Sequence, residues 1–125
     1  MDITGKKAVV FGGTSGIGLS TTKQLVAKGA EVIAISRDPS KAGDLGPGVT
    51  LEACDATDEA QTKDLLARLA PYDILISAAT GGGRAIGPFM SMEMSGFQAS
   101  FAKMWGYANV VRHGAGHVAD GGCIV

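Results

Sequence analysis

The sequence predicts an α/β protein of three layers, in which helices cover both faces of a doubly wound parallel sheet. Along its 125 residues, short apolar runs alternate with segments whose apolar residues recur at helical spacing. Uninterrupted apolar runs are typical of strands buried on both faces, and strict alternation with helices favours parallel strands joined by right-handed crossovers. Glycine accounts for 19 residues and clusters where predicted strands and helices meet, as expected of tight turns.

Five strands are predicted from the apolar runs. They cover residues 7–11, 32–35, 49–53, 73–77 and 123–125, and the last of them stops after three residues. The helices are predicted at 17–28, at 39–45 as a brief stretch, from a cap at Asp58 to just before Pro71, and at 97–118 as the longest helix. The chain has neither a linker nor an internal repeat, so we expect a single domain over residues 1–125.

Charge and hydropathy exclude several classes of partner. Eleven basic and twelve acidic residues are scattered along the chain without a block of one sign, so we expect neither a nucleic acid nor an anionic membrane as a partner. The sequence has no apolar stretch typical of a signal peptide or a membrane span, and we expect a cytoplasmic protein. Cys54 and Cys123 form no Cys-x-x-Cys pair, so both are expected to be buried free thiols.

A glycine-rich segment, from Gly12 to Gly18, joins the first predicted strand to the first helix. Its glycines let the backbone turn tightly and approach a pyrophosphate, whose charge is stabilised by the N–H groups and the positive dipole end of the helix. No Lys-Ser or Lys-Thr pair follows, which excludes a Walker A loop. A tight turn without a ligand is the alternative. The expected dinucleotide contacts are Gly12, Thr14, Ser15, Gly16, Ile17 and Gly18.

The spacing Gly12-x-x-x-Gly16-x-Gly18 resembles the fingerprint of the classical short-chain dehydrogenases/reductases, although Phe11 stands where that family usually has threonine. The resemblance spans nearly the whole chain but only about the first half of a typical family domain. It implies an incomplete NAD(P)-binding Rossmann domain that is truncated after the fifth strand. It also implies hydride transfer between a nicotinamide cofactor and a carbonyl or alcohol, in a protein that forms a homo-oligomer along its long central helices.

The end of the second predicted strand decides which cofactor the resemblance implies. NAD-preferring members usually carry an acid there for the ribose 2′-hydroxyl, whereas this chain has Ser36 and Arg37. A guanidinium binds a 2′-phosphate through charge-assisted hydrogen bonds, which favours NADP(H) over NAD(H). An ordinary surface arginine beside Asp38 is the alternative, because Ser15 stands where many NADP-preferring members have a second basic residue.

Further positions also resemble the family. Asp55, followed by Ala56, stands where the family has an aspartate that reaches the adenine amino group, although an ordinary turn acid is the alternative. Ala79 follows the fourth strand, where the backbone of the family passes beside the cofactor. Lys103 replaces the asparagine of the family's catalytic tetrad, which indicates a divergent branch. The sequence leaves open whether this lysine reaches the site or extends into solvent.

The family's catalytic serine and its Tyr-x-x-x-Lys motif are missing from the chain, so we assign no catalytic residue. A small carbonyl or alcohol substrate is expected only if the other half of the family domain is present. The alternative is a non-catalytic dinucleotide-binding or oligomeric interaction module that is complete at 125 residues. His113 and His117 share a helical face but have no third ligand, so no metal site is expected. Arg84, after the fourth strand, either contacts a substrate anion or is solvated.

Overall fold

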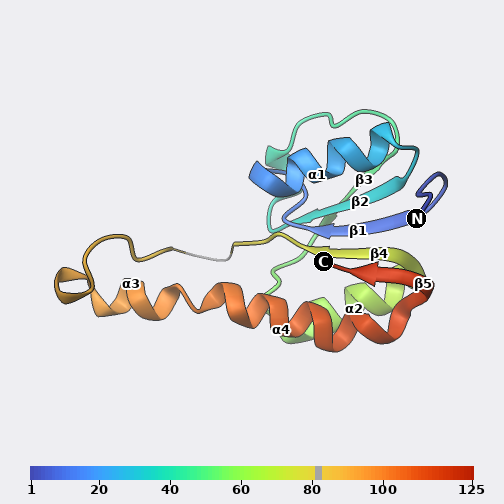
Figure 1. Cartoon of the computed structure of the whole chain (residues 1–125). Coiled ribbons are helices and arrows are strands. Elements are labelled where there is room, and N and C mark those ends of the chain that lie inside the picture. The colour runs from blue at the N-terminus through green and yellow to red at the C-terminus, as the bar shows by residue number, and fades with distance from the viewer. Residues whose placement is uncertain (81–82) are drawn as a thin grey trace.

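A computed structural model describes residues 1–80 and 83–125 of the chain. Its centre is a sheet of five parallel strands in the order β3-β2-β1-β4-β5 (Figure 1). The strands are β1 (Lys7–Phe11), β2 (Glu31–Ser36), β3 (Val49–Ala53), β4 (Tyr72–Ser77) and β5 (Val118–Ile124). Because β1 pairs with β2 on one side and with β4 on the other, the direction of winding reverses at β1. The predicted parallel α/β sheet is confirmed.

Helices lie on both sides of this sheet and make the three layers (Figure 1). Helix α1 (Gly16–Ala27) lies on one face, whereas α2 (Glu59–Leu69) and α4 (Ala102–Gly114) pack together on the other. Beyond the edge of the sheet, α3 (Met94–Ala99) continues the line of α4. The short 3-10 turns are η1 (Pro39–Lys41), η2 (Phe89–Ser91) and η3 (Ala115–His117). Within residues 1–80 and 83–125, no helix is long and apolar enough to cross a membrane.

The two faces of β1 belong to two separate apolar cores. Val9 and Phe11 lie in the core under α2 and α4, whereas Ala8 and Val10 lie in the core under α1. All four residues are almost completely buried, which explains why β1 is apolar without alternation. Both cores therefore hold the central strand in place, and with it the glycine turn that follows.

The prediction of one continuous helix over residues 97–118 is wrong. Helices α3 and α4 are separate, with a break at Ser100 and Phe101. The Ser100 hydroxyl donates to the Gly96 carbonyl oxygen and accepts a hydrogen bond from the Ala85 amide, both at 3.0 Å. A serine that bonds back to the preceding turn and also to a neighbouring loop competes with regular helical hydrogen bonding. The Phe101 amide accordingly bonds to the carbonyl three residues back, that of Gln98.

The end of that helix and the start of the last strand also differ from expectation. Helix α4 ends at Gly114, and β5 begins at Val118 instead of at residue 123. The buried Tyr72 hydroxyl donates to the Gly114 carbonyl oxygen at 3.0 Å, and Val118 then pairs with Tyr72. A side chain at Gly122 would lie 2.3 Å from the Asp73 carbonyl oxygen. Gly122 therefore lets β5 lie close to β4, and does not end a helix.

Two smaller expectations change as well. The stretch 39–45 contains only the short turn η1, because Gly43 and Gly46 take left-handed conformations with φ of +69° and +83°. Cys54 is buried as predicted, whereas Cys123 is only half-buried; both are free thiols.

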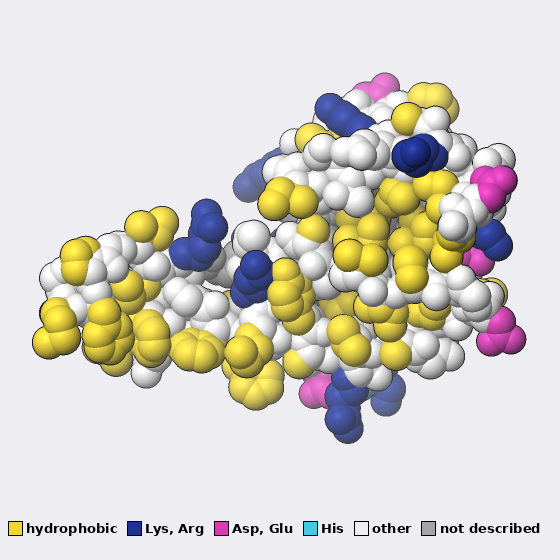
Figure 2. All heavy atoms as spheres, in the orientation of Figure 1, with side chains coloured by type: hydrophobic (Ala, Val, Ile, Leu, Met, Phe, Trp, Pro, Cys, Tyr) yellow, Lys and Arg dark blue, Asp and Glu magenta, His cyan; other side chains and the backbone are white. Residues whose placement is uncertain are grey.

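Large apolar side chains are exposed along residues 86–105, a segment that we call the apolar arm (Figure 2). The arm packs against itself, since Phe97 stacks edge-to-face with both Phe89 and Phe101, at ring-centroid distances of 5.8 and 5.5 Å. The large apolar side chains that remain exposed on it are Ile86, Phe89, Met90, Met94, Phe101, Met104 and Trp105. A contiguous apolar surface of this kind marks an interaction site in folded proteins.

Candidate functional site

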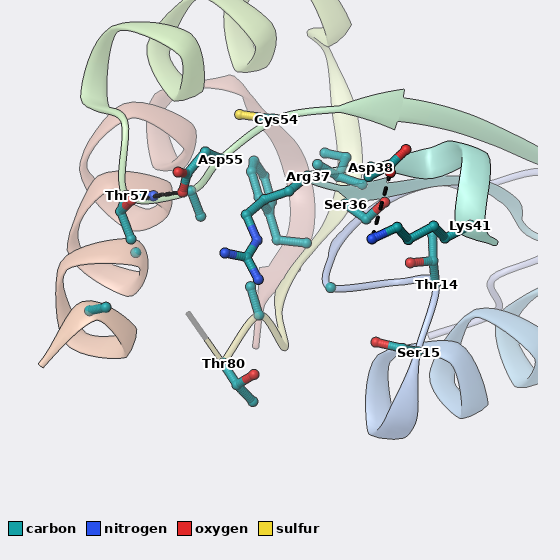
Figure 3. A pocket seen from close by; sticks show the side chains of 17 residues that line it. Thr14, Ser15, Ser36, Arg37, Asp38, Lys41, Cys54, Asp55, Thr57 and Thr80 are labelled. Atoms are coloured by element: carbon teal, nitrogen blue, oxygen red, sulfur yellow. Dashed lines mark hydrogen bonds and ion pairs between the residues drawn. The ribbon is translucent and has the colours of Figure 1, made fainter. Parts of the chain in front are cut away.

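A cavity of about 540 Å³ lies at the carboxyl ends of the central strands (Figure 3). The turn after β1, the end of β2 with η1, the loop after β3 and the residues after β4 all contribute to its lining. Ala102 and Gly106 contribute from α4. The edge of an open parallel sheet where the winding reverses is the usual place for a ligand.

Most residues that were expected to contact a dinucleotide line this cavity. They are Gly12, Thr14, Ser15, Ser36, Arg37, Asp55, Ala56 and Ala79. Gly16, Ile17 and Gly18 are not among the lining residues. The Ile17 side chain is 82% exposed, and Gly18 is buried in the first turn of α1. These three residues form the start of α1, directly after the part of the turn that lines the cavity.

The three glycines of the turn are required for different physical reasons. A side chain at Gly12, whose φ is +76°, would lie 2.7 Å from the Ala79 amide nitrogen. A side chain at Gly18 would lie 2.0 Å from the Gly12 carbonyl oxygen, so this glycine lets α1 pack onto the turn. Gly16 has a φ of +53° and open space where a side chain would be. The turn is therefore closely packed at Gly12 and Gly18 and open at Gly16. A backbone that is open on one side can approach a phosphate closely.

Two cations line the cavity, and sequence analysis identified only Arg37. The second is Lys41, at the end of η1, whose Nζ lies 3.9 Å from the Asp38 Oδ2 atom. Asp38 caps η1 by accepting hydrogen bonds from the Ser40 amide and hydroxyl. The Ser40 hydroxyl is the main cause that lowers the pKa of Asp38, and the charge of Lys41 lowers it further. The spacing of Lys41 four residues after Arg37 was the only signal in the sequence.

Asp55 is held as a carboxylate in a fixed orientation. Its Oδ1 atom accepts hydrogen bonds from the Thr57 hydroxyl at 2.7 Å and from the Thr57 amide at 2.9 Å. These two bonds lower the pKa of Asp55, partial burial opposes them, and the positive charge of Arg37 lowers it further. Because both bonds fall on Oδ1, the contacts that the structure gives Asp55 leave Oδ2 available to a ligand.

The loop after β3 is also tied to α4. The Asn109 side-chain amide donates to the Ala56 carbonyl oxygen at 2.9 Å, a contact that sequence analysis missed. Gly106 lies one turn earlier, where a side chain would be 3.4 Å from the Ala56 Cβ atom. These two residues explain how α4 approaches the cavity closely enough to line it.

The remaining polar groups near the cavity differ in what they can do. Burial raises the pKa of the Cys54 thiol, so this cysteine is an inert lining group. The hydroxyl oxygen of Ser36 is buried and has no hydrogen-bond partner in the structure. An unpaired buried hydroxyl at the end of β2 is a group that a ligand in the cavity could satisfy.

Other candidate residues lie outside the cavity. Lys103 is exposed, and its Nζ lies over the Tyr107 ring at 5.4 Å from the centroid, so its side chain does not line the site. Arg84 is exposed in the loop before η2. The His113 Nε2 atom lies 2.8 Å from Glu59 Oε1, which links α4 to α2. In the part of the chain that the structure describes, no three His, Cys, Asp or Glu residues are grouped to hold a metal.

Comparison with protein families then identifies the chain. The model of the short chain dehydrogenase family matches residues 6–125. The chain belongs to that family. L-xylulose reductase from Mesocricetus auratus is 33% identical over 104 residues, which are 81% of this chain and 42% of that protein. A "Probable oxidoreductase" from Streptomyces antibioticus is 43% identical over 89 residues, which are 63% of this chain and 30% of that protein.

Solved structures of short chain dehydrogenases have the same fold. A short chain dehydrogenase/reductase family protein is 32% identical, with a TM-score of 0.79 over 94% of this chain and 51% of that chain. A short chain dehydrogenase from Burkholderia cenocepacia J2315, solved in complex with NADP, is 27% identical, with a TM-score of 0.83 over 94% and 50% of the two chains. The chain thus spans between about a third and half of the proteins that it matches.

Proposed function

We propose that the chain binds NADP(H) in the cavity at the carboxyl ends of the strands. It would be the nucleotide-binding portion of an oxidoreductase that transfers hydride between NADP(H) and a carbonyl or alcohol. The observation that carries the proposal is that the glycine turn and the cation Arg37 line the same cavity. Ser36 also lines it, at a position where an acidic side chain would repel a 2′-phosphate. The NADP complex of the Burkholderia relative supports a dinucleotide in this place.

The glycine turn is assigned to the pyrophosphate. The open space at Gly16 lets a phosphate approach the backbone closely. The backbone N–H groups at the start of α1 provide positive potential there. The hydroxyls of Thr14 and Ser15 are additional donors beside the phosphates. Gly12, Ile17 and Gly18 complete this contact through the shape of the backbone.

The adenosine half is assigned to the other strand ends. Arg37 pairs with the 2′-phosphate, and Ser36 lies at the ribose. The Asp55 carboxylate, oriented by Thr57, accepts from the adenine amino group, with Ala56 beside the ring. Ala79, after β4, lets the backbone pass close to the cofactor.

The nicotinamide ring supplies or accepts the hydride when the cofactor is bound. The residues of this chain bind and orient, because none of them forms a Tyr-x-x-x-Lys pair that could move the proton of the carbonyl reaction. We therefore expect the chain alone to bind NADPH without oxidising it in the presence of carbonyl compounds.

Titration of the chain with NADPH and with NADH, followed by nicotinamide fluorescence, tests the proposal. NADPH should bind at least about tenfold more tightly, the effect of one or two charge-assisted hydrogen bonds. Arg37→Ala should weaken NADPH selectively and leave NADH unchanged. Arg112→Ala, which removes an exposed arginine of α4 outside the cavity, is the matched control. Equal affinity of the unaltered chain for the two cofactors would contradict the assignment.

We also propose that the apolar arm and the exposed side of α4 contact a second copy of the chain. Met104 and Trp105, which belong to the part of the arm that lies on α4, are 64% and 66% exposed. Large, flexible and aromatic side chains of this kind are enriched in the centres of protein interfaces.

A further inference from the structure

Two cations face the cavity from different directions. The charge of Arg37 acts on Asp55, after β3, whereas the charge of Lys41 acts on Asp38, after β2. In Figure 3 the Arg37 guanidinium lies on the side of Asp55, and the Lys41 ammonium lies on the side of the glycine turn. The two positive charges are therefore separated across the cavity and are not clustered at one point.

The short turn η1 positions Lys41 at the cavity. Asp38 caps this turn shortly after the end of β2, and the turn ends at Lys41, after two backbone hydrogen bonds, from the Lys41 amide to the Asp38 carbonyl oxygen and from the Ala42 amide to the Pro39 carbonyl oxygen. The lysine side chain then extends along the cavity between the end of β2 and the turn after β1, where Thr14 lies (Figure 3). With the ribose at Ser36, as proposed above, Lys41 is the cation on the glycine-turn side of that ribose.

We infer that Lys41 is the second cation of a 2′-phosphate site, and that it acts from the glycine-turn side opposite Arg37. The inference rests on the proposed binding of NADP(H). A phosphate monoester carries a charge of about −1.5 to −2 at neutral pH, so one guanidinium neutralises only part of it. Ser15, in the turn, brings no charge. Lys41 supplies a compact positive charge on that side, with three hydrogen-bond donors.

Asp38 is the group that competes for this lysine. Its ion pair with Lys41 is weak, because the two side chains are 51% and 82% exposed and their charged atoms are 3.9 Å apart. Lys41 can therefore exchange the carboxylate for a phosphate without the loss of a strong contact. The negative charge of Asp38 also repels a phosphate in the cavity. Removal of that charge, with the cap of η1 retained, should strengthen phosphate binding.

A pair of probes isolates the 2′-phosphate from the rest of the cofactor. Adenosine 2′,5′-bisphosphate and adenosine 5′-monophosphate differ only in that group, and calorimetry or displacement of a fluorescent nucleotide gives the affinity of the chain for each. Lys41→Met should lower the preference for the bisphosphate by about tenfold, the effect of one charge-assisted hydrogen bond. Lys41→Arg should retain most of it, because the charge is kept.

Two further variants serve as controls. Lys23→Met removes an equal charge from an exposed position on α1 outside the cavity and should leave both affinities unchanged. Asp38→Asn keeps an acceptor for the Ser40 amide but removes the charge, and should raise the preference for the bisphosphate a few-fold. All variants should show the circular dichroism and unfolding midpoint of the unaltered chain.

The outcomes separate this inference from the proposed function. If the unaltered chain prefers the bisphosphate and Lys41→Met keeps that preference, Lys41 has no role and the inference is overturned, while NADP(H) binding stands. If the unaltered chain binds neither probe, or binds both equally, the proposed cofactor preference itself fails, and the inference fails with it. A preference that Lys41→Met lowers, and Lys23→Met does not, supports the assignment.

Discussion

Gly18 shows how a single missing side chain supports the site. An added Cβ atom would lie 2.0 Å from the Gly12 carbonyl oxygen, a backbone atom that cannot move without the turn. Helix propensity acts in the opposite direction, because alanine inside a helix is more stable than glycine by roughly 0.5–1 kcal/mol. If Gly18→Ala lowers the free energy of unfolding, the close contact with Gly12 outweighs helix propensity. If it raises the free energy of unfolding, helix propensity outweighs the contact.

Gly18→Ala is expected to destabilise the chain by about 1–3 kcal/mol, as overpacking does, and to weaken NADPH binding together with it. Urea unfolding, followed by circular dichroism, measures the first effect. Gly116→Ala is the control, since a Cβ atom at that exposed glycine meets nothing within 4 Å, and its effect should stay within about 0.5 kcal/mol. A stabilising Gly18→Ala would show that the turn relaxes freely.

At this scale, sequence analysis identified the glycines and Arg37 because their positions in the motif indicate their chemistry. It missed Lys41 because residues 39–45 were expected to form a longer helical stretch. The left-handed glycines after Lys41 end that stretch, and only the resulting conformation shows that the lysine lines the cavity. Asn109 was missed for a similar reason, since its partner is a carbonyl group 53 residues earlier.

At the scale of elements, one hydroxyl joins β4 to the end of α4. Tyr72 is buried, donates to the Gly114 carbonyl oxygen at 3.0 Å, and pairs through its backbone with Val118 of β5. Burial raises the pKa of Tyr72 from 10 to about 12, because the neutral phenol is favoured in the folded state. Its contribution to stability is thus complete below pH 10 and is lost as the pH rises from 10 toward 12.

Tyr72→Phe should remove this loss. The free energy of unfolding of the unaltered chain is expected to fall between pH 10 and 12, and that of the variant to fall less over the same interval. At neutral pH the variant should be less stable by about 1 kcal/mol, because the Gly114 carbonyl oxygen loses its donor. Denaturant unfolding at a series of pH values measures both effects. Identical pH profiles for the two proteins would refute the argument.

The elements themselves were mostly predictable, since β1, β3 and the cap of α2 at Asp58 lie where the apolar runs and the capping residue place them. The break between α3 and α4 was not. Phe97, Phe101 and Met104 keep helical spacing across it, so periodicity cannot reveal a turn that Ser100 makes with the distant Ala85 amide. Similarly, β5 begins before its apolar run, because its first residues are set by pairing with β4.

At the scale of the whole molecule, apolar surface is distributed unequally. The arm and the outer side of α4 expose a row of large apolar side chains (Figure 2). Helices α2 and α4 pack on one face of the sheet, whereas on the other face α1 lies over β1 and β2, and Ile124 and Val125 at the end of β5 are exposed (Figure 1). Burial of such surface stabilises an association by roughly 25 cal/mol for each Å² removed from water, before the entropic cost of association. Self-association is therefore expected to depend on this surface.

The corresponding variant is Met104→Glu. Sedimentation velocity should show the unaltered chain as an oligomer and this variant as a smaller species, because a carboxylate in an apolar interface is strongly unfavourable. Ala27→Glu introduces the same charge at an exposed position of α1 and should not change the sedimentation coefficient. A monomeric unaltered chain would argue against the proposed contact.

The strand order also has a consequence for the order of folding. Strands β1, β2 and β3 are neighbours along the chain, whereas β4 reaches β1 only after a long loop is closed; the Lys7 amide, for example, bonds to a carboxylate 66 residues later. Because closing a long loop costs entropy before its contacts can form, we expect these distant contacts to form late. Because the cavity needs residues from both groups of strands, a nucleotide can bind only after β4 has docked. A bound nucleotide would therefore lengthen the lifetime of the folded chain and leave its folding rate unchanged.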